Sequence, residues 1–251
     1  MHVLPVIDLK AGQVVRGVGG RRELYQAVVS CLAPDSTPGS IARAFAERFG
    51  FTAVYVADLD AIGGAEPNWR ALQQIAAVGL HLWIDAGVSN REQANRLASF
   101  SDGIGPPPNI VIGLESVDSP ATLATLFNMI GQTQRAVFSL DLKDLHPLTD
   151  SSAWEGMSAL EIAKIATQVG FRQIIVLDLA RVGMQQGTGI EPVCRQLRQF
   201  DPQLQITAGG GIRGLADLKR LASAGCNAAL VASALHDGHM TKANIDAVVD
   251  L

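Results

Sequence analysis

The stretch VLPVIDLK, residues Val3–Lys10, decides the fold because its last part returns as LDLK at Leu140–Lys143. In both copies a short apolar run leads into an aspartate, Asp8 in the first and Asp141 in the second. A carboxylate at the end of a buried strand is costly unless something pairs with it or uses it. The repeated pattern therefore makes Asp8 and Asp141 the first candidates for functional residues.

Two further pairs of segments repeat in the same order. Val56–Leu59 is similar to Val176–Leu179, and Ala86–Val88 is similar to Gly210–Ile212. The period is about half the chain, which exceeds the roughly 20–50 residues of solenoid repeats. We therefore predict a single domain over residues 1–251 that is built from two fused halves. The predicted halves are roughly 1–131 and 132–251.

Short β-type runs alternate with amphipathic helical runs along the chain. The predicted strands are Val3–Asp8, Thr52–Asp58, His81–Asp85, Asn109–Gly113, Ala136–Asp141, Gln173–Asp178, Gln205–Ala208 and Ala228–Ala232. The predicted helices are Gly39–Phe49, Asn68–Val78, Arg91–Phe100, Pro120–Ile130, Ala159–Val169, Glu191–Phe200, Leu215–Ala224 and Lys242–Val249. Such alternation favours an α/β fold, a (β/α)8 TIM barrel with right-handed crossovers. An open doubly wound sheet is the alternative, but the sequence lacks its glycine-rich motif after strand one.

Composition argues against several classes of protein. The chain has 24 acidic and 20 basic residues, a formal charge of −4, and no basic clusters of the kind that bind nucleic acid. Asp8 and Lys10 interrupt the first apolar run, which does not resemble a signal peptide, and no apolar stretch is long enough to cross a bilayer. We expect a cytoplasmic protein that binds neither nucleic acid nor membrane and exists as a monomer or weak homo-oligomer.

A barrel places the two aspartates in one site. Strands one and five lie opposite each other, so Asp8 and Asp141 are expected to face one another where barrel active sites form. Two such carboxyl groups can divide the work of general base and general acid if their surroundings separate their pKa values. The sequence contains no metal-ligand cluster, and proton transfer between carboxyl groups needs no cofactor.

A glycine-rich turn follows the seventh predicted strand. Gly209, Gly210 and Gly211 leave backbone N–H groups uncovered at the start of a helix, which suits a phosphate group. Ala232 and Ser233 follow strand eight with a small side chain and a hydroxyl, and barrels often build a phosphate site from these two loops. The pattern predicts a phosphorylated small-molecule substrate, with a tight turn that holds no ligand as the alternative.

These residues resemble the histidine-biosynthesis barrel family, which includes the phosphoribosylformimino-5-aminoimidazole carboxamide ribotide isomerase and the imidazole glycerol phosphate synthase cyclase. Ile7–Lys10 is similar to the first strand of that family, and Phe138–Asp141 is similar to its fifth. The resemblance implies that Asp8 and Asp141 are the general base and general acid of an Amadori rearrangement. In that reaction an aminoaldose, here a phosphoribosyl amino sugar, becomes an aminoketose.

The resemblance extends to other candidate substrate-binding residues. Trp154 is similar in placement to a loop-five tryptophan that covers the substrate in some isomerases, and Ala228–Ser233 is nearer to the cyclase form. Asp178 repeats the position of Asp58. A strand-end aspartate of this kind either contacts the substrate or accepts hydrogen bonds from the backbone of a neighbouring loop.

The chain departs from the family after strands three and four. Asp85–Gly87 stands where the family has a second glycine turn, and Gly113–Glu115 stands where it has glycine followed by serine or threonine. Asp85 would repel a phosphate, and Leu114 removes a hydroxyl donor. We predict that this second phosphate site is lost. Asp85 and Glu115 are then either solvated carboxylates or contacts to a cation or amine.

Three functions remain open from the sequence. The first is an isomerase of the family type, with cyclase activity as a variant. The second is a divergent paralogue that takes a monophosphorylated substrate in another pathway, such as cofactor biosynthesis. The third is a non-catalytic barrel that binds a metabolite. In the loops, Arg16, Arg21 and Arg22 are expected to be solvated, with contact to an anionic substrate over the mouth as the alternative. His146 is expected to be an exposed loop residue, with a proton shuttle as the alternative.

Overall fold

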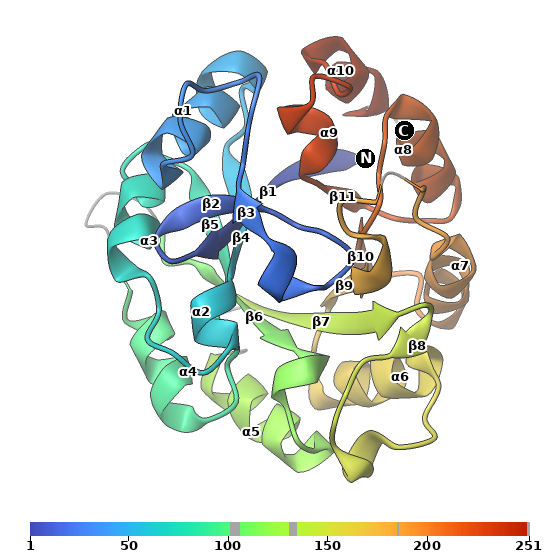
Figure 1. The fold of residues 1–251 in the computed structure, drawn as a ribbon. Coiled ribbons are helices and arrows are strands. Elements are labelled where there is room, and N and C mark those ends of the chain that lie inside the picture. The colour runs from blue at the N-terminus through green and yellow to red at the C-terminus, as the bar shows by residue number, and fades with distance from the viewer. Residues whose placement is uncertain (101–105, 131–134, 185, 250–251) are drawn as a thin grey trace.

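A closed barrel of eight parallel strands forms the centre of the computed structural model (Figure 1). The structure describes residues 1–100, 106–130, 135–184 and 186–249. In order around the barrel the strands are β1 His2–Lys10, β4 Ala53–Asp58, β5 His81–Asp85, β6 Asn109–Gly113, β7 Ala136–Lys143, β9 Gln173–Asp178, β10 Gln205–Gly209 and β11 Ala228–Val231. The barrel closes where β11 pairs with β1, from His2 opposite Ala228 to Pro5 opposite Val231. The predicted (β/α)8 fold is confirmed, whereas its origin from two half-barrels stays a prediction.

A ring of helices covers the outside of the barrel (Figure 1). The longer ones are α1 Pro38–Phe49, α3 Trp69–Ala76, α4 Arg91–Ala98, α5 Pro120–Ile130, α6 Ala159–Val169, α7 Glu191–Phe200, α8 Leu215–Ser223 and α10 Lys242–Val249. Each overlaps a predicted helix, because each has the apolar periodicity that one buried face requires. Within the described part of the chain, no helix combines the length and the apolar character that a membrane span needs.

Short elements lie between the barrel strands and these helices. They are β2 Gln13–Arg16, η1 Arg22–Leu24, β3 Gln26–Ala27, α2 Leu59–Ile62, η2 Leu114–Ser116, β8 His146–Pro147, η4 Ser152–Trp154, η5 Leu179–Arg181 and α9 Ser233–His236. The sequence pattern does not predict them, because a single turn or a two-residue strand is too short to show a period.

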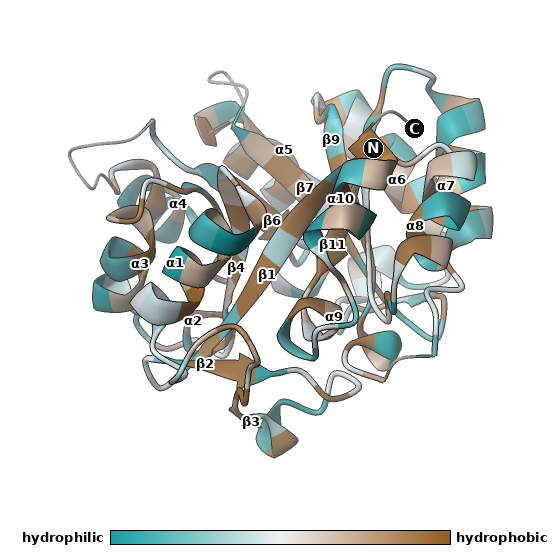
Figure 2. Ribbon diagram, turned by 90° about the horizontal axis from the view of Figure 1, so that it is seen from above, coloured by the Kyte–Doolittle hydropathy of each residue, from teal (hydrophilic) through white to brown (hydrophobic). Residues whose placement is uncertain are grey.

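The chain folds back on itself at the end of β1. Lys10 pairs with Gln13 across a two-residue turn in which Ala11 and Gly12 have φ values of 50° and 73°. Positive φ at both positions matches the twist of a hairpin, and glycine adopts it without steric cost. The turn places β2 and β3 at the end of the molecule where β1 ends (Figure 2). The segment between β1 and α1 therefore lies near the carboxyl ends of the barrel strands.

Alternation along each strand divides the buried side chains into two cores. The core inside the barrel contains Leu4, Val6, Tyr55, Ala57, Val111, Val137, Ile175 and Leu230. The larger core lies between the barrel and the helices and includes Ile7 and Leu9 of β1. Residues two positions apart on a strand share a core. This parity decides which strand-end side chains can reach the mouth of the barrel.

Candidate active site

A cavity of about 80 Å3 lies at the carboxyl ends of the barrel strands. We call it the mouth cavity. Its polar side chains are Asp8, Arg22, Tyr25, Tyr55, Asp85, Glu115, Asp141 and Ser233. Gly183, Gly210 and Gly211 contribute backbone to the same lining. The location agrees with the rule that barrel enzymes place their active sites at this end.

Strand parity brings three aspartates into the cavity. Asp8 lies two residues after Val6 on β1, Asp85 ends β5, and Asp141 lies four residues after Val137 on β7. Val6 and Val137 both belong to the core inside the barrel. Because side chains alternate between the two faces of a strand, the aspartates point inward as well.

Asp8 is half-buried at the floor of the mouth cavity. Burial raises the pKa of its carboxyl group from 3.8 to about 7, and the positive charge of Arg22 opposes that rise. A carboxyl group with a pKa near neutral pH exchanges a proton readily, as a general base must.

Asp141 is more deeply buried, with 2% of its surface exposed. Its Oδ1 accepts a hydrogen bond from the Ser139 hydroxyl at 2.6 Å, and its Oδ2 accepts a long one from the Glu115 N–H at 3.4 Å. Burial raises the pKa of Asp141 well above its usual value, and the negative charges of Glu115 and Asp85 add to the rise. Asp141 is therefore the carboxyl group of the cavity that is suited to hold a proton at neutral pH.

Asp85 is also buried, and Tyr55 is its main partner. The Tyr55 hydroxyl donates to Asp85 Oδ2 at 2.9 Å, and the Gly87 N–H donates to Oδ1 at 3.3 Å. Burial raises the pKa of Asp85 to about 6, with a further rise from the charge of Glu115 that these hydrogen bonds oppose. Asp85 is thus not a solvated carboxylate, which removes one of the two alternatives left open by the sequence.

Arg22 and Glu115 form an ion pair at the cavity wall. The Arg22 guanidinium on η1 donates to Glu115 Oε1 on η2, and both side chains are about one-quarter to one-third exposed. The expectation of a solvated Arg22 is therefore wrong. Arg16 is not free in solvent either, because it pairs through two hydrogen bonds with Asp237. Loop arginines are normally solvated, but here the β2–β3 hairpin folds back toward the mouth.

The glycine turn contributes backbone to the opposite part of the lining. Gly210 and Gly211 have φ values of 99° and 77°. A Cβ at Gly210 would lie 2.5 Å from the carbonyl oxygen of Asp178, and one at Gly211 would lie 2.6 Å from that of Gly187. Only glycine fits both the conformation and the space.

Ser233 and Ala232 lie beside the glycine turn in the cavity lining, as the sequence predicts for neighbouring loops. Gly209 differs from its two neighbours because it ends β10 among the side chains inside the barrel. A Cβ there would come within 2.9 Å of Leu177 and 3.1 Å of Leu230. We refer to Gly210, Gly211 and Ser233 as the glycine side of the cavity, and to Asp85, Glu115 and Asp141 as the carboxyl side.

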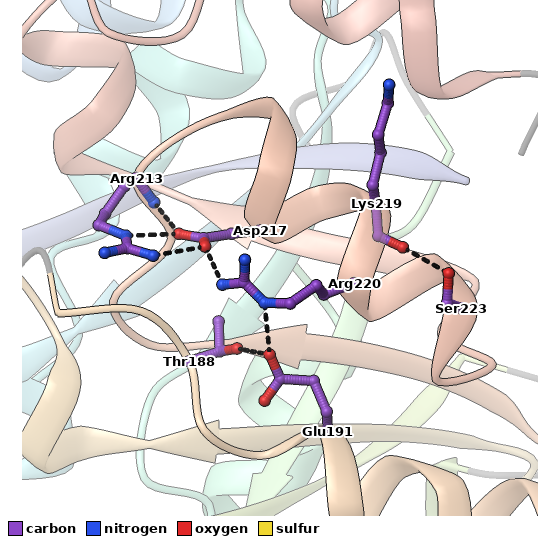
Figure 3. Close-up of polar contacts among 7 residues, drawn as sticks. All are labelled: Thr188, Glu191, Arg213, Asp217, Lys219, Arg220 and Ser223. Atoms are coloured by element: carbon purple, nitrogen blue, oxygen red, sulfur yellow. Dashed lines mark hydrogen bonds and ion pairs between the residues drawn. The ribbon is translucent and has the colours of Figure 1, made fainter.

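A network of charged residues begins two residues after Gly211 and lies outside the cavity lining (Figure 3). Arg213 follows the turn, and its backbone N–H, Nε and one terminal nitrogen all donate to the buried carboxylate of Asp217 at 2.9–3.0 Å. Arg220 donates to Asp217 as well and reaches Glu191 Oε1 at 3.4 Å. Glu191 in turn accepts from the Thr188 hydroxyl at 2.9 Å. The network joins the loop after β9 to the loop after β10.

Asp178 lies outside the cavity lining. It is fully buried, and its carboxylate accepts hydrogen bonds from the N–H groups of Asp144, Leu145 and Ala180, each at 3.1 Å. The adjacent Leu177 faces the barrel interior, so parity turns Asp178 toward the helices. Asp178 holds the loop after β7, where Asp144 and Leu145 have positive φ.

Trp154 and His146 also lie away from the mouth cavity. Trp154 is 1% exposed, and its indole N–H donates to the carbonyl of Val117 at 3.0 Å. It belongs to a separate surface hollow in the loop after β7. His146 is exposed, as predicted.

Sequence reasoning missed the cavity residues Tyr25 and Tyr55, and it missed the pairing of Arg22 with Glu115. Parity along β4 contained a signal for Tyr55, because it lies two residues before Ala57 and three before the strand-end Asp58. The ion pair joins residues 93 apart in sequence and has no local signal. Among the described residues, no three histidine, cysteine or acidic side chains are arranged to hold a metal ion.

Comparison with known proteins adds to this geometry. A family model described as histidine biosynthesis protein matches residues 2–241. A relative from Caldicellulosiruptor bescii is 31% identical over 96% of both chains, and one from Thermus thermophilus is 28% identical over 96% of both. Each is named 1-(5-phosphoribosyl)-5-((5-phosphoribosylamino)methylideneamino) imidazole-4-carboxamide isomerase. An uncharacterized protein of Methanocaldococcus jannaschii is 29% identical over 95% of this chain and 94% of its own.

Proposed function

This chain belongs to the histidine biosynthesis protein family, and on that premise we propose that it is an aldose–ketose isomerase acting on a phosphoribosyl amino sugar. Asp141 is the general acid and Asp8 the general base. The relatives from Caldicellulosiruptor and Thermus carry the name of an isomerase of that kind. The observation that carries the proposal is that Asp8, Asp141 and the glycine side line the same cavity.

The chemistry requires proton transfers at three positions of the sugar: the ring oxygen, C2 and C1. Asp141 gives a proton to the ring oxygen as the bond between that oxygen and C1 breaks, and the C1 nitrogen lone pair forms the double bond of a protonated imine. Asp8 then takes the proton from C2, and the resulting enolamine tautomerises to the aminoketose as C1 gains a proton. The surroundings of the two carboxyl groups support this division: burial raises the pKa of both, the positive charge of Arg22 opposes the rise at Asp8, and the negative charges of Glu115 and Asp85 add to it at Asp141.

The glycine side is proposed to hold the phosphate. Gly210 and Gly211 expose backbone in a conformation that leaves no room for a side chain, and Ser233 adds a hydroxyl. Backbone N–H groups in such a turn suit an anion. Trp154 and Asp178 are proposed to act through the loop after β7 rather than by touching the substrate, since neither lines the cavity.

A second candidate is a divergent paralogue whose substrate has a single phosphate. The carboxyl side favours it, because Asp85, Glu115 and Asp141 lie in the lining together. A second phosphate brought against these groups would meet like charge in a buried site. A group that donates hydrogen bonds or carries positive charge suits that part of the cavity better.

The proposal is tested in a histidine auxotroph that lacks the isomerase, together with the purified protein and the bisphosphorylated substrate of the named relatives. We expect the chain to restore growth, and Asp8→Asn or Asp141→Asn to lower kcat by about 10^2- to 10^4-fold, the usual range for acid–base groups. Asp246→Asn is the matched control, because Asp246 is an exposed aspartate of α10 that pairs with the exposed Lys242, away from the cavity.

The outcomes separate the two candidates. Full activity in both aspartate variants contradicts the acid–base roles. If growth is not restored but the protein isomerises a monophosphorylated amino sugar with the same dependence on Asp8 and Asp141, the second candidate is correct.

A further inference from the structure

Tyr55 is a buried cavity residue to which the proposed reaction assigns no role. It lies on β4 with 3% of its surface exposed, and its hydroxyl donates to Asp85 Oδ2. With the Gly87 N–H on Oδ1, both oxygens of Asp85 have a donor. Hydrogen bonds of this kind stabilise a carboxylate rather than a carboxylic acid.

Asp85 and Asp141 come close together because Gly113 lies between them. A Cβ at Gly113 would be 2.9 Å from Asp141 Oδ2 and 3.9 Å from Asp85 Oδ2. Glycine therefore leaves one oxygen of each carboxyl group next to the same open position, where any side chain at residue 113 would stand. The negative charge of one carboxyl group in a buried site disfavours ionisation of its neighbour, so the titrations of the two groups depend on each other.

The surroundings decide which member of the pair ionises first. Asp85 receives its bond from a phenol, whereas Asp141 receives its short bond from the Ser139 alcohol. A phenol, with an ordinary pKa of about 10, is the stronger donor, and a serine hydroxyl can also rotate to accept a bond from a protonated partner. The negative charge of Glu115 raises the pKa of both carboxyl groups, whereas the hydrogen bonds of Tyr55 and Gly87 and the charge of Arg22 lower that of Asp85. The charged and titratable groups around the pair are Asp8, Arg22, Tyr25, Tyr55 and Glu115.

From this geometry we infer that Tyr55 is a positioning residue: its hydroxyl bond keeps Asp85 as the carboxylate of the Asp85–Asp141 pair and so leaves the proton of the pair on Asp141. The inference rests on the proposed function, in which Asp141 must be protonated before each turnover. It adds a role for two residues, Tyr55 and Asp85, that need not touch the reacting atoms.

The test follows the aspartate carboxyl groups directly, by carbon-13 NMR titration of protein labelled at the side-chain carboxyl carbon. Asp141→Asn and Asp85→Asn assign the two signals. We expect Asp85→Asn to lower the titration midpoint of Asp141 by about one pH unit or more, because the neighbouring negative charge is gone. Tyr55→Phe keeps the ring but not the donor, and it should make Asp85 titrate higher and Asp141 begin to ionise at lower pH.

Tyr25→Phe is the matched control. It removes a phenol from the Asp8 part of the same cavity, and the Asp141 titration should not change. The inference is overturned if Asp141 titrates identically in the wild type and in Tyr55→Phe, or if Asp85→Asn leaves its midpoint in place.

Activity gives a second reading that separates this inference from the proposed function. In an active enzyme, the alkaline limb of the kcat profile should move to lower pH in Tyr55→Phe by the shift that NMR records for Asp141. A wild type with the expected titrations but no isomerase activity contradicts the proposed function alone. An active enzyme whose kcat profile is the same in Tyr55→Phe contradicts the positioning role.

Discussion

The two sides of the mouth cavity differ in where their charged residues lie. The glycine side offers backbone and one hydroxyl, and its charged residues stand behind the turn, where Asp217 binds Arg213 and Arg220. The carboxyl side places its charged groups in the cavity itself, and burial raises the pKa values of Asp85 and Asp141. The glycine side depends on a backbone conformation that leaves no room for side chains. On the carboxyl side, burial disfavours the ionised form of the carboxyl groups.

This difference predicts how substitutions should act. The glycine side depends on backbone conformation, so its variants should fail for steric reasons at every pH. The carboxyl side depends on protonation, so its variants should change the pH dependence of stability or rate.

The steric test is Gly210→Ala. The new Cβ would lie 2.5 Å from the Asp178 carbonyl oxygen at a φ of 99°. We expect the free energy of unfolding to fall by about 3 kcal/mol. We also expect affinity for inorganic phosphate to fall about ten-fold, equivalent to one lost hydrogen bond to a charged group. Chemical denaturation and calorimetric titration measure the two effects.

Gly214→Ala is the control for that variant. Gly214 follows the turn by three residues, has an extended backbone with φ 176°, and has open space within 4 Å of an added Cβ. Its stability should stay within about 0.5 kcal/mol of the wild type. Equal losses in both variants would contradict a turn held by close backbone contact.

The support behind the glycine side is tested by Asp217→Asn. Burial disfavours the charge on Asp217, but hydrogen bonds from Arg213 and Arg220 outweigh it and lower the pKa of this carboxyl group. Losing the charge should cost about 1–2 kcal/mol of unfolding free energy, because both guanidinium groups are half-exposed and can be solvated. Phosphate affinity should fall about three-fold. Asp246→Asn, which removes an exposed pair with Lys242, should cost less than about 0.5 kcal/mol. Wild-type phosphate affinity in Asp217→Asn would show that the network does not support the turn.

Asp85→Asn, on the carboxyl side, should show the smallest change in the free energy of unfolding, and this change should be a gain. The pKa of Asp85 rises from 3.8 to about 6 on folding, so the folded state binds more protons and stability falls as pH rises between these values. Above pH 6 the free-energy cost of burying the ionised Asp85 is constant, and an uncharged asparagine at this position does not have that cost. We expect Asp85→Asn to be more stable than the wild type by about 1 kcal/mol at pH 8, and this gain to vanish near pH 4. Unfolding at both pH values measures the difference, and a gain that is independent of pH would contradict the electrostatic origin.

Local patterns in the sequence predicted the barrel strands, the eight longer helices and the glycine turn. They succeed because each is a short-range requirement: apolar alternation for a strand, a 3.6-residue period for a helix, and glycine where φ is positive. The inward direction of Asp8 and Asp141 also follows from the position of each in its strand. The same alternation places Asp178, which follows the inward-facing Leu177, on the outer face of its strand. It also places Tyr55 on the same inner face as Ala57, two residues later.

Contacts between distant residues were beyond sequence reasoning. Arg22 reaches Glu115, and Tyr55 reaches Asp85, across loops and strands whose separation in space no local pattern encodes. Trp154 is a further example. Its position in the loop after β7 suggested a contact with the substrate, but its indole N–H donates to the carbonyl oxygen of Val117.

Local sequence patterns were enough to predict eight strand–helix units that close into a barrel, with an aspartate near the end of β1, another near the end of β7 and a glycine turn at the end of β10. Only the tertiary structure decided the electrostatics of the cavity. The pKa of a carboxyl group depends on how much water it loses and which charges come near it, and both are set by residues that lie far apart in the chain. Asp8, Asp85 and Asp141 look alike in the sequence, and the fold alone makes them titrate differently.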